Sequence, residues 1–165
     1  LSLRKIDALE EPTRDSPIIF LGEDIAYKEG PLFSPAFLER EFFPRLKRLV
    51  SALHDKGLKV LYHSDGNLFP VLDSLLECGI DGLNPLEDME LRKLRERAPE
   101  LFLAGGIDCS NLLPFGSPDE IREAVRDAIK DVGPGLFLGS TSEIHNNIPL
   151  ENIRAMIEAC REAGE

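Results

Sequence analysis

The sequence predicts an α/β fold built on a parallel sheet, and three features of its pattern support this. Five short apolar runs alternate with longer amphipathic segments along the 165 residues, which is the order of elements in repeated βα units. The apolar runs are continuous, so both faces of the sheet are expected to be buried. Each run also ends in polar or glycine residues, which places functional groups at one edge of a parallel sheet.

Each predicted strand is followed by a predicted helix. The expected strands are residues 17–21, 59–62, 80–83, 101–104 and 136–138. The expected helices are residues 34–53, 68–78, 88–97, 117–132 and 150–163, preceded by the end of a helix at residues 2–9. The segment from Gly22 to Phe33 is expected to be a loop.

Three prolines give local information about these helices. Ser34 and Pro35 form an N-cap followed by a first-turn proline, a common helix start. Residues 117–120, Ser-Pro-Asp-Glu, match a capping box with a proline in the first turn. Pro44 lies inside a helical pattern and predicts a kink or a break there.

The number of units is smaller than a closed barrel requires. A (β/α)8 barrel has eight units and typically about 250 residues. We therefore interpret residues 1–165 as a single domain, the C-terminal five units of such a barrel, with the N-terminal units absent. A five-stranded doubly wound sheet is the alternative. An unclosed sheet leaves an unpaired edge and an apolar face, which predicts self-association or a missing N-terminal half.

Composition excludes several classes of protein. The chain is 42% hydrophobic and 30% charged, and no apolar run approaches the roughly 18 residues of a membrane span. A net charge of −11 argues against binding nucleic acid or anionic membranes. No glycine-rich nucleotide fingerprint is present. The scattered cysteines, Cys78, Cys109 and Cys160, fit a reducing cytoplasm, where we expect the protein to reside.

The segment from Lys59 to Gly66 is the most informative part of the chain. Its apolar strand leads directly into His63, Ser64 and Asp65. Residues i and i+2 of a strand point to the same side, so His63 and Asp65 present an imidazole and a carboxylate to one space. Such a pair suits a metal site or a proton-transfer couple. The alternative is a core histidine followed by an aspartate that caps the turn.

Other polar residues follow the remaining strands, and each has a structural alternative. With His63 and Asp65, Asp24 is a candidate catalytic residue and Glu23 lies beside it; solvated loop charges are the alternative. For metal binding the expected ligands are His63, Asp65 and Glu143. The candidate substrate-binding residues, for which helix entry, close packing or loop structure are the alternatives, are Asn84, Gly105, Gly106, Asp108 and Ser140.

Five segments, in this order along the chain, resemble the uroporphyrinogen decarboxylase family and its corrinoid-dependent methyltransferase branch. They are GEDIAYKEGPLFSP, HSDGN, GIDGLNPLE, AGGID and GSTSEIHNNIPLEN. The resemblance implies a TIM (β/α)8 barrel with a deep cleft at the strand C-termini. It also implies substrates that are tetrapyrroles or methyl groups carried by a corrinoid, with a corrinoid protein as a partner.

Within this family the sequence is more similar to the methyltransferase branch. Decarboxylases usually carry Gly-His-Gly after the last strand, where this chain has Gly139-Ser140-Thr141. They also tend to have Asp-Trp where this chain has Asn84-Pro85. The resemblance thus implies methyl transfer involving a corrinoid, with a decarboxylase of tetrapyrrole biosynthesis, or a catalytically incomplete binding module, as alternatives. We expect the complete barrel to be an enzyme and these residues alone to be inactive.

The methyltransferase branch uses zinc held by a His-x-Cys pair and a later cysteine. His63 matches the histidine, Asp65 stands at the first cysteine position, and residues 140–143 lie near the second. Aspartate, glutamate and histidine still bind zinc, but they form a harder site than thiolates do. The absence of cysteines at these two positions leaves open a different methyl acceptor, a different metal or no metal.

Overall fold

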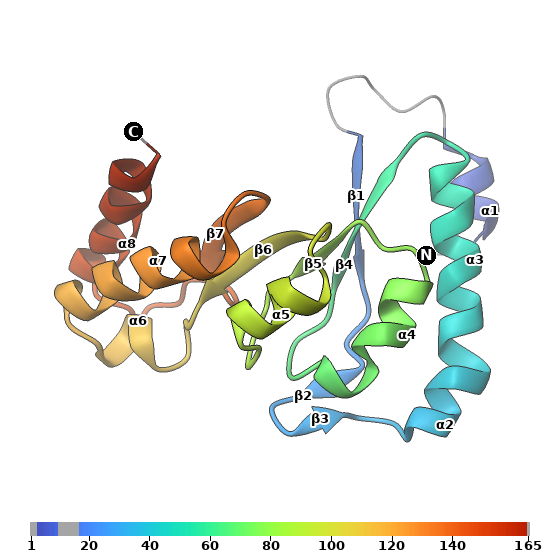
Figure 1. Cartoon of the computed structure of the whole chain (residues 1–165), viewed down its shortest axis with the longest axis horizontal. Coiled ribbons are helices and arrows are strands. Elements are labelled where there is room, and N and C mark those ends of the chain that lie inside the picture. Colours follow the sequence, from blue (N-terminus) through green and yellow to red (C-terminus); the bar gives the residue numbers. More distant parts are fainter. Residues whose placement is uncertain (1–2, 10–16, 165) are drawn as a thin grey trace. The chain divides into compact units, whose positions relative to one another are not determined.

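The computed structural model of the protein describes residues 3–9 and 17–164. The chain folds into two compact units, residues 1–83 and residues 84–165 (Figure 1). Residue 2 of the first predicted helix lies outside the described residues. Each unit combines parallel strands with helices, as the sequence predicts.

The first unit contains a parallel strand pair. β1 (Ile18–Gly22) and β4 (Lys59–His63) run parallel. The next strand in order, β5 (Gly82–Asn84), begins in this unit, and its last residue belongs to the second. On β4, Val60 and Tyr62 are fully buried. On β1, however, Ile18 and Phe20 are 49% and 58% exposed. The expectation that both sheet faces are buried is therefore wrong for β1, because the core of this unit covers one face only.

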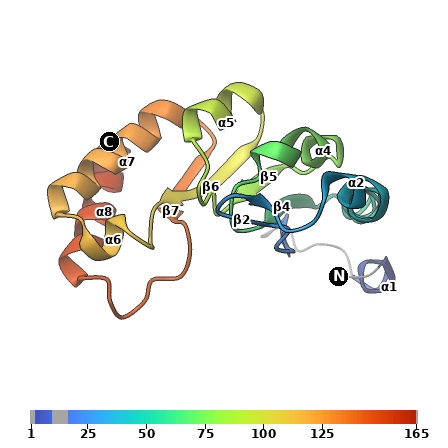
Figure 2. The ribbon, with the colours of Figure 1, turned by 90° about the horizontal axis from the view of Figure 1, so that it is seen from below.

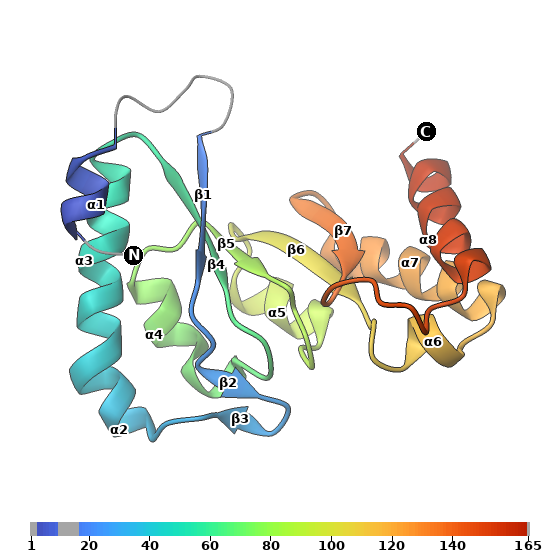
Figure 3. The ribbon, with the colours of Figure 1, turned by 180° about the vertical axis from the view of Figure 1, so that it is seen from behind.

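The helices of the first unit pack beside one another, as α1 and α3 do in Figure 3. In chain order the helical segments are α1 (Leu3–Asp7), α2 (Pro35–Phe37), the π-helical turn η1 (Leu38–Phe42), α3 (Phe43–His54), the 3-10 turn η2 (Phe69–Val71) and α4 (Leu72–Glu77). The N-cap predicted at Ser34 is confirmed, since its Oγ accepts a hydrogen bond from the Phe37 N–H at 3.3 Å.

The irregularity predicted at Pro44 takes the form of the π-helical turn η1. Pro44 has no N–H and so cannot donate to the carbonyl of Arg40, four residues earlier. The N–H of Phe43 bonds instead to the carbonyl of Leu38, five residues earlier. The helix therefore widens by one residue immediately before the proline and continues as α3.

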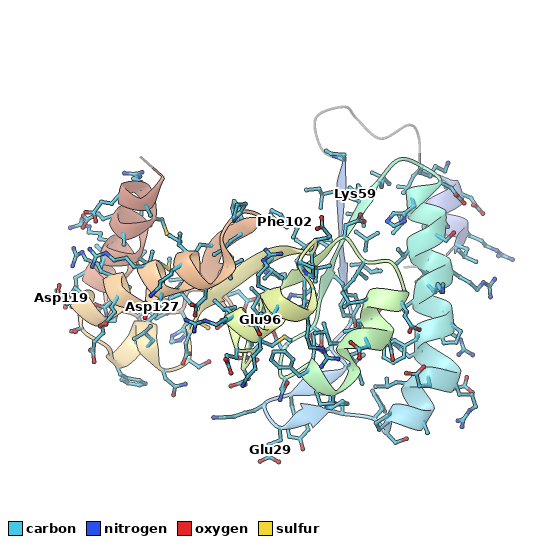
Figure 4. All side chains as sticks on the ribbon, viewed as in Figure 1. Glu29, Lys59, Glu96, Phe102, Asp119 and Asp127 are labelled. Atoms are coloured by element: carbon cyan, nitrogen blue, oxygen red, sulfur yellow. The ribbon has the colours of Figure 1, made fainter. Side chains whose placement is uncertain are left out.

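A short hairpin replaces part of the loop expected between Gly22 and Phe33. β2 (Ala26–Tyr27) and β3 (Gly30–Pro31) pair in antiparallel fashion, and Glu29 lies in the turn between them (Figure 4). Figure 3 shows the hairpin at the carboxyl end of β1. Two residues per strand are too few to produce a recognisable alternation, so the sequence pattern gave no sign of it.

The second unit contains its own parallel pair, β6 (Phe102–Ile107) and β7 (Leu136–Ser140), with Leu103 opposite Leu136 and Ile107 opposite Ser140. Its core gathers apolar residues from both strands and from helices, of which α7 and α8 lie side by side (Figure 2). The helices of this unit are α5 (Leu91–Arg97), α6 (Leu112–Phe115), α7 (Pro118–Val132) and α8 (Leu150–Ala163).

The start of α7 confirms the predicted capping box. Ser117 Oγ accepts from the Glu120 N–H at 3.3 Å, and the Glu120 carboxylate accepts from the Ser117 N–H at 2.7 Å. Among the described helices, none combines the length and apolar character needed to cross a membrane.

Candidate functional site

The candidate site lies where β1 and β4 end. Because Gly22 stands opposite His63 in the parallel register, the segments that follow the two strands leave the sheet at the same edge. Asp24 follows β1 and Asp65 follows β4. The fold thus brings together two segments that are about forty residues apart in the sequence.

Three side chains converge at this edge. His63 Nε2 lies 3.7 Å from Asp24 Oδ1 and 3.8 Å from Asp65 Oδ1. One potential ligand atom from each residue lies within 4.8 Å of the other two. The side chains of Asp24, His63 and Asp65 are 55%, 26% and 43% exposed, although the Oδ1 atom of Asp65 is itself buried. The His63 ring also packs against Phe20, with ring centroids 5.1 Å apart.

Hydrogen bonds hold the two segments against each other. The Asp65 N–H donates to Asp24 Oδ1 at 3.2 Å, and the Glu23 N–H donates to the His63 carbonyl at 3.1 Å. Tyr62 donates its hydroxyl proton to the Glu23 carbonyl at 2.8 Å. Burial raises the pKa of Tyr62 far above its ordinary value, and the charges of Glu23 and Asp24 add to this. The phenol therefore stays protonated and remains a donor.

Gly66 allows the β2–β3 hairpin to approach this site closely. It has a φ of +82°, and a Cβ added to it would lie 2.5 Å from the backbone of Tyr27. The next residue, Asn67, donates its N–H to the Tyr27 carbonyl at 2.9 Å. A side chain at position 66 is excluded both by the backbone conformation and by this contact.

The donor set suits a divalent metal ion. One imidazole nitrogen and two carboxylate oxygens are ligands found for zinc and for other first-row divalent ions. The structure brings the expected ligands His63 and Asp65 together and adds Asp24 as the third. Glu143 belongs to the second unit, so its role as a ligand stays a prediction. The catalytic roles of Asp24, His63 and Asp65 also stay predictions.

In the second unit, the structure gives Gly105 a packing role. A Cβ at Gly105 would lie 2.0 Å from the Pro85 carbonyl oxygen, and that oxygen accepts from the Gly106 N–H at 3.2 Å. Of the two explanations considered for these glycines, close approach of a neighbouring backbone thus accounts for Gly105. Asn84 donates its amide Nδ2 to the Ala104 carbonyl at 3.1 Å. Substrate binding by Asn84, Gly105 and Gly106 stays a prediction.

Asp108 organises the turn that follows β6. Its carboxylate accepts from the Ser110 N–H at 2.7 Å, from the Asn111 N–H at 2.9 Å and from Asn111 Nδ2 at 3.0 Å. Burial acts to raise the pKa of Asp108, but the hydrogen bonds from Asn111 and Ser110 outweigh it and lower the pKa below its ordinary value. Asp108 is therefore an ionised turn residue at neutral pH, and its contact with substrate stays a prediction.

The residues after β7 make local contacts. Ser140 Oγ donates to the Ser142 carbonyl at 2.7 Å, and Ser142 Oγ donates to the Glu143 carboxylate at 2.8 Å. Cys109, the cysteine nearest a strand end, is 3% exposed and accepts from Thr141 Oγ1 at 3.5 Å. Substrate binding by Ser140 stays a prediction.

The residues that brace the site carry little signal in the sequence. Tyr62 fits the pattern of an apolar strand, Ser64 matches no motif, and Gly66 simply ends the segment. The one available signal was a small hydroxyl residue between two candidate ligands, at the end of a buried strand.

Parallel strands with polar groups at their carboxyl ends and helices between them are the arrangement of βα units in a (β/α)8 barrel. The family described as Uroporphyrinogen decarboxylase (URO-D) matches residues 20–163. The chain therefore belongs to the URO-D family, as the ordered segments implied.

The curated relatives include a methyltransferase and a decarboxylase. The chain is 24% identical over 130 residues to the Methylcobamide:CoM methyltransferase MtbA of Methanosarcina acetivorans, covering 79% of this chain and 38% of that protein. It is 28% identical over 138 residues to the Uroporphyrinogen decarboxylase of Christiangramia forsetii, covering 82% of this chain and 39% of that protein. The chain thus spans about two fifths of the length of these curated relatives.

A solved structure shows the same fold. A methyltransferase from Methanosarcina mazei matches with a TM-score of 0.71 and 25% identity, covering 90% of this chain and 42% of that chain. This similarity and the family match confirm the expected fold class, βα units of a URO-D-type TIM barrel.

Proposed function

We propose that the protein is a methyltransferase of the URO-D family that moves a methyl group between a corrinoid and a small-molecule acceptor. The observation that carries this proposal is the convergence of Asp24, His63 and Asp65 at the strand ends. The similarity to two methyltransferases supports it. The name of the relative from Methanosarcina acetivorans includes a methylcobamide, so we propose a corrinoid, free or on a carrier protein, as the partner.

In this proposal Asp24, His63 and Asp65 hold a divalent metal ion, with zinc the first choice. His63 would offer a ring nitrogen and the two aspartates would neutralise the charge of the ion. A bound ion of this kind acts as a Lewis acid that lowers the pKa of an acceptor group. Without an ion, His63 and an aspartate form a proton-transfer couple for the same acceptor.

The aspartate ligands of the proposed metal ion influence which methyl acceptor it would favour. The two aspartates are harder ligands than the thiolates of the methyltransferase branch, and hard ligands favour oxygen or nitrogen partners over sulfur. The proposal therefore includes acceptors other than thiols. Decarboxylation of a tetrapyrrole is the second candidate, which the relative from Christiangramia forsetii favours.

The experiment compares the two activities in the same preparation. The complete barrel, loaded with zinc, is used because these residues alone are expected to be inactive. It is mixed with methylcobalamin and a thiol or hydroxyl acceptor, and demethylation is followed by visible absorption. His63→Gln is expected to reduce the rate by about 100-fold or more, in the range of losing a positioned acid–base or ligand group. His54→Gln, the same change at the end of α3, is expected to leave the rate unchanged. Carbon dioxide release from uroporphyrinogen without methyl transfer would overturn the proposal in favour of the decarboxylase.

A further inference from the structure

Ser64 lies between two of the three converging residues and is almost completely buried. It is 1% exposed, which is unfavourable for a hydroxyl group unless its hydrogen bonds are satisfied. Its Oγ accepts from the Ile25 N–H at 3.0 Å and donates to the Asp65 carbonyl at 3.0 Å. The cost of burying this hydroxyl is therefore offset by two bonds to the backbone.

These two bonds reach the chain on both sides of the site. Ile25 directly follows Asp24 after β1, and it is itself 2% exposed, so its N–H depends on a protein acceptor. The second bond ends on the backbone of Asp65, after β4. The Ser64 hydroxyl thus links the backbone beside Asp24 to the backbone of Asp65.

We propose that Ser64 is a positioning residue that sets the separation of the Asp24 and Asp65 carboxylates from His63 Nε2, and so the affinity of the site for a divalent cation. The cation rests on the proposed function, whereas the positioning can be measured without it. Replacing the hydroxyl would leave the buried Ile25 N–H without its acceptor and let the segment after β1 move. The bond from the Asp65 N–H to Asp24 Oδ1, 3.2 Å long, would then weaken.

The test uses Ser64→Ala with Ser117→Ala as a matched control. Ser117 loses the same hydroxyl and also a bond from a backbone N–H, but it caps α7 in the other unit. Zinc affinity is measured by competition with a chromophoric chelator. We expect Ser64→Ala to weaken zinc binding by about 10- to 100-fold, as for other residues that orient metal ligands. Ser117→Ala is expected to stay within about twofold of the unmutated chain.

A second readout needs neither metal nor activity. Amide hydrogen exchange, followed by NMR, reports on the N–H groups of Ile25 and Asp65. Ser64→Ala is expected to speed exchange at both residues, whereas Ser117→Ala leaves them unchanged. Acceleration at Ile25 and Asp65 without acceleration at the Val60 N–H, which bonds to Asp81 in the same unit, distinguishes positioning of the carboxylates from a general loss of stability.

Each result decides the inference. Equal zinc affinity in Ser64→Ala and the unmutated chain would overturn it. If the unmutated chain binds no zinc, the proposed metal fails, and the exchange of the Asp65 amide alone decides: acceleration supports positioning, and no change refutes it. If Ser64→Ala does not fold, Ser64→Cys replaces it, with a smaller loss in both readouts expected from its weaker hydrogen bonds and no loss in either refuting the inference.

Discussion

Gly66 is the residue on which the approach of the β2–β3 hairpin to the site depends. A Cβ there would lie 2.5 Å from the Tyr27 backbone at a φ of +82°. Gly57 has a similar φ of +75°, but nothing lies within 4 Å of its added Cβ. We expect Gly57→Ala to cost about 1–2 kcal/mol, the price of a left-handed conformation, and Gly66→Ala to cost clearly more. Urea unfolding measures both, and equal losses would show that the contact with Tyr27 is unimportant.

Asp81 is a second residue whose importance the sequence did not reveal. Its Oδ1 accepts from Lys59 Nζ at 2.8 Å, while Oδ2 contacts His54 Nε2 at 2.7 Å and accepts from the Val60 N–H at 2.9 Å. Burial acts to raise the pKa of Asp81, but the hydrogen bonds from Lys59, Val60 and His54 lower it below its ordinary value. The ionised carboxylate therefore stabilises the fold above the pKa it has in the unfolded chain.

The lowered pKa of Asp81 predicts how the stability of the fold depends on pH. Asp81→Asn is expected to lower the free energy of unfolding by about 1–2 kcal/mol at pH 7. The difference should shrink as the pH falls from about 5 toward 2, because the carboxylate of the unmutated chain is then protonated through its lowered pKa. Asp127→Asn on the exposed face of α7 (Figure 4) is the control, expected to change little at any pH. A loss that persists undiminished at low pH would contradict the assignment.

At the scale of elements, Arg95 connects the end of α5 to the segments that enter β6 and β7. Its Nε donates to Val132 at 3.0 Å and its Nη2 to Pro134 at 3.2 Å, both beyond α5 in the sequence. Its Nη1 donates to three further carbonyls, those of Ala98, Pro99 and Leu101. The planar guanidinium thus joins two loops through backbone oxygens alone.

Arg95→Lys tests this connection, because a lysine ammonium lacks the fork geometry that reaches several carbonyls at once. We expect the free energy of unfolding to fall by about 1–3 kcal/mol as carbonyl partners lose their donors. Arg154→Lys on the exposed side of α8 keeps the charge and serves as the control. If both substitutions have the same small effect in thermal or urea unfolding, Arg95 does not hold the loops.

The elements that the sequence predicted well are those with long patterns or specific end signals. The helix start at Ser117 and the irregularity at Pro44 were both foreseen, because capping residues and a missing N–H act locally. The boundaries of β5 and β6 were less accurate: β5 begins at Gly82 rather than at residue 80, and β6 continues to Ile107. Glycine within β6 looked like the end of a strand, whereas it admits the Pro85 backbone.

The site was foreseen only as far as neighbouring residues in one strand determine it. The side chains of His63 and Asp65 were expected on the same side because they are two residues apart. The sequence could not single out Asp24 from the other charged residues, because its position beside His63 depends on the register of β1 with β4. The contacts of Ser64 and Tyr62 could not be predicted because their partners lie 39 residues earlier in the chain. Those of Arg95 could not be predicted because its partners are backbone carbonyls, which every residue has.

At the scale of the whole molecule, exposed apolar strand residues predict self-association. Ile18 on β1 is 49% exposed and Phe137 on β7 is 70% exposed; Phe102 at the start of β6, labelled in Figure 4, is 38% exposed. Apolar strand residues left open to solvent in this way favour association. Sedimentation velocity at several concentrations should show species larger than a monomer, and Ile18→Lys with Phe137→Lys should reduce them. A monodisperse monomer at every concentration would count against this prediction.

Anomalous X-ray scattering at the zinc absorption edge is the most direct test of the metal site. Crystals soaked in zinc should show a peak about 2.0–2.2 Å from His63 Nε2 and from a carboxylate oxygen of Asp24 and of Asp65, the usual ligand distances of zinc. The same soak of His63→Gln crystals should leave the peak absent or strongly reduced. Zinc bound elsewhere at full occupancy, with no peak among Asp24, His63 and Asp65, would contradict the proposal that these residues form a metal centre.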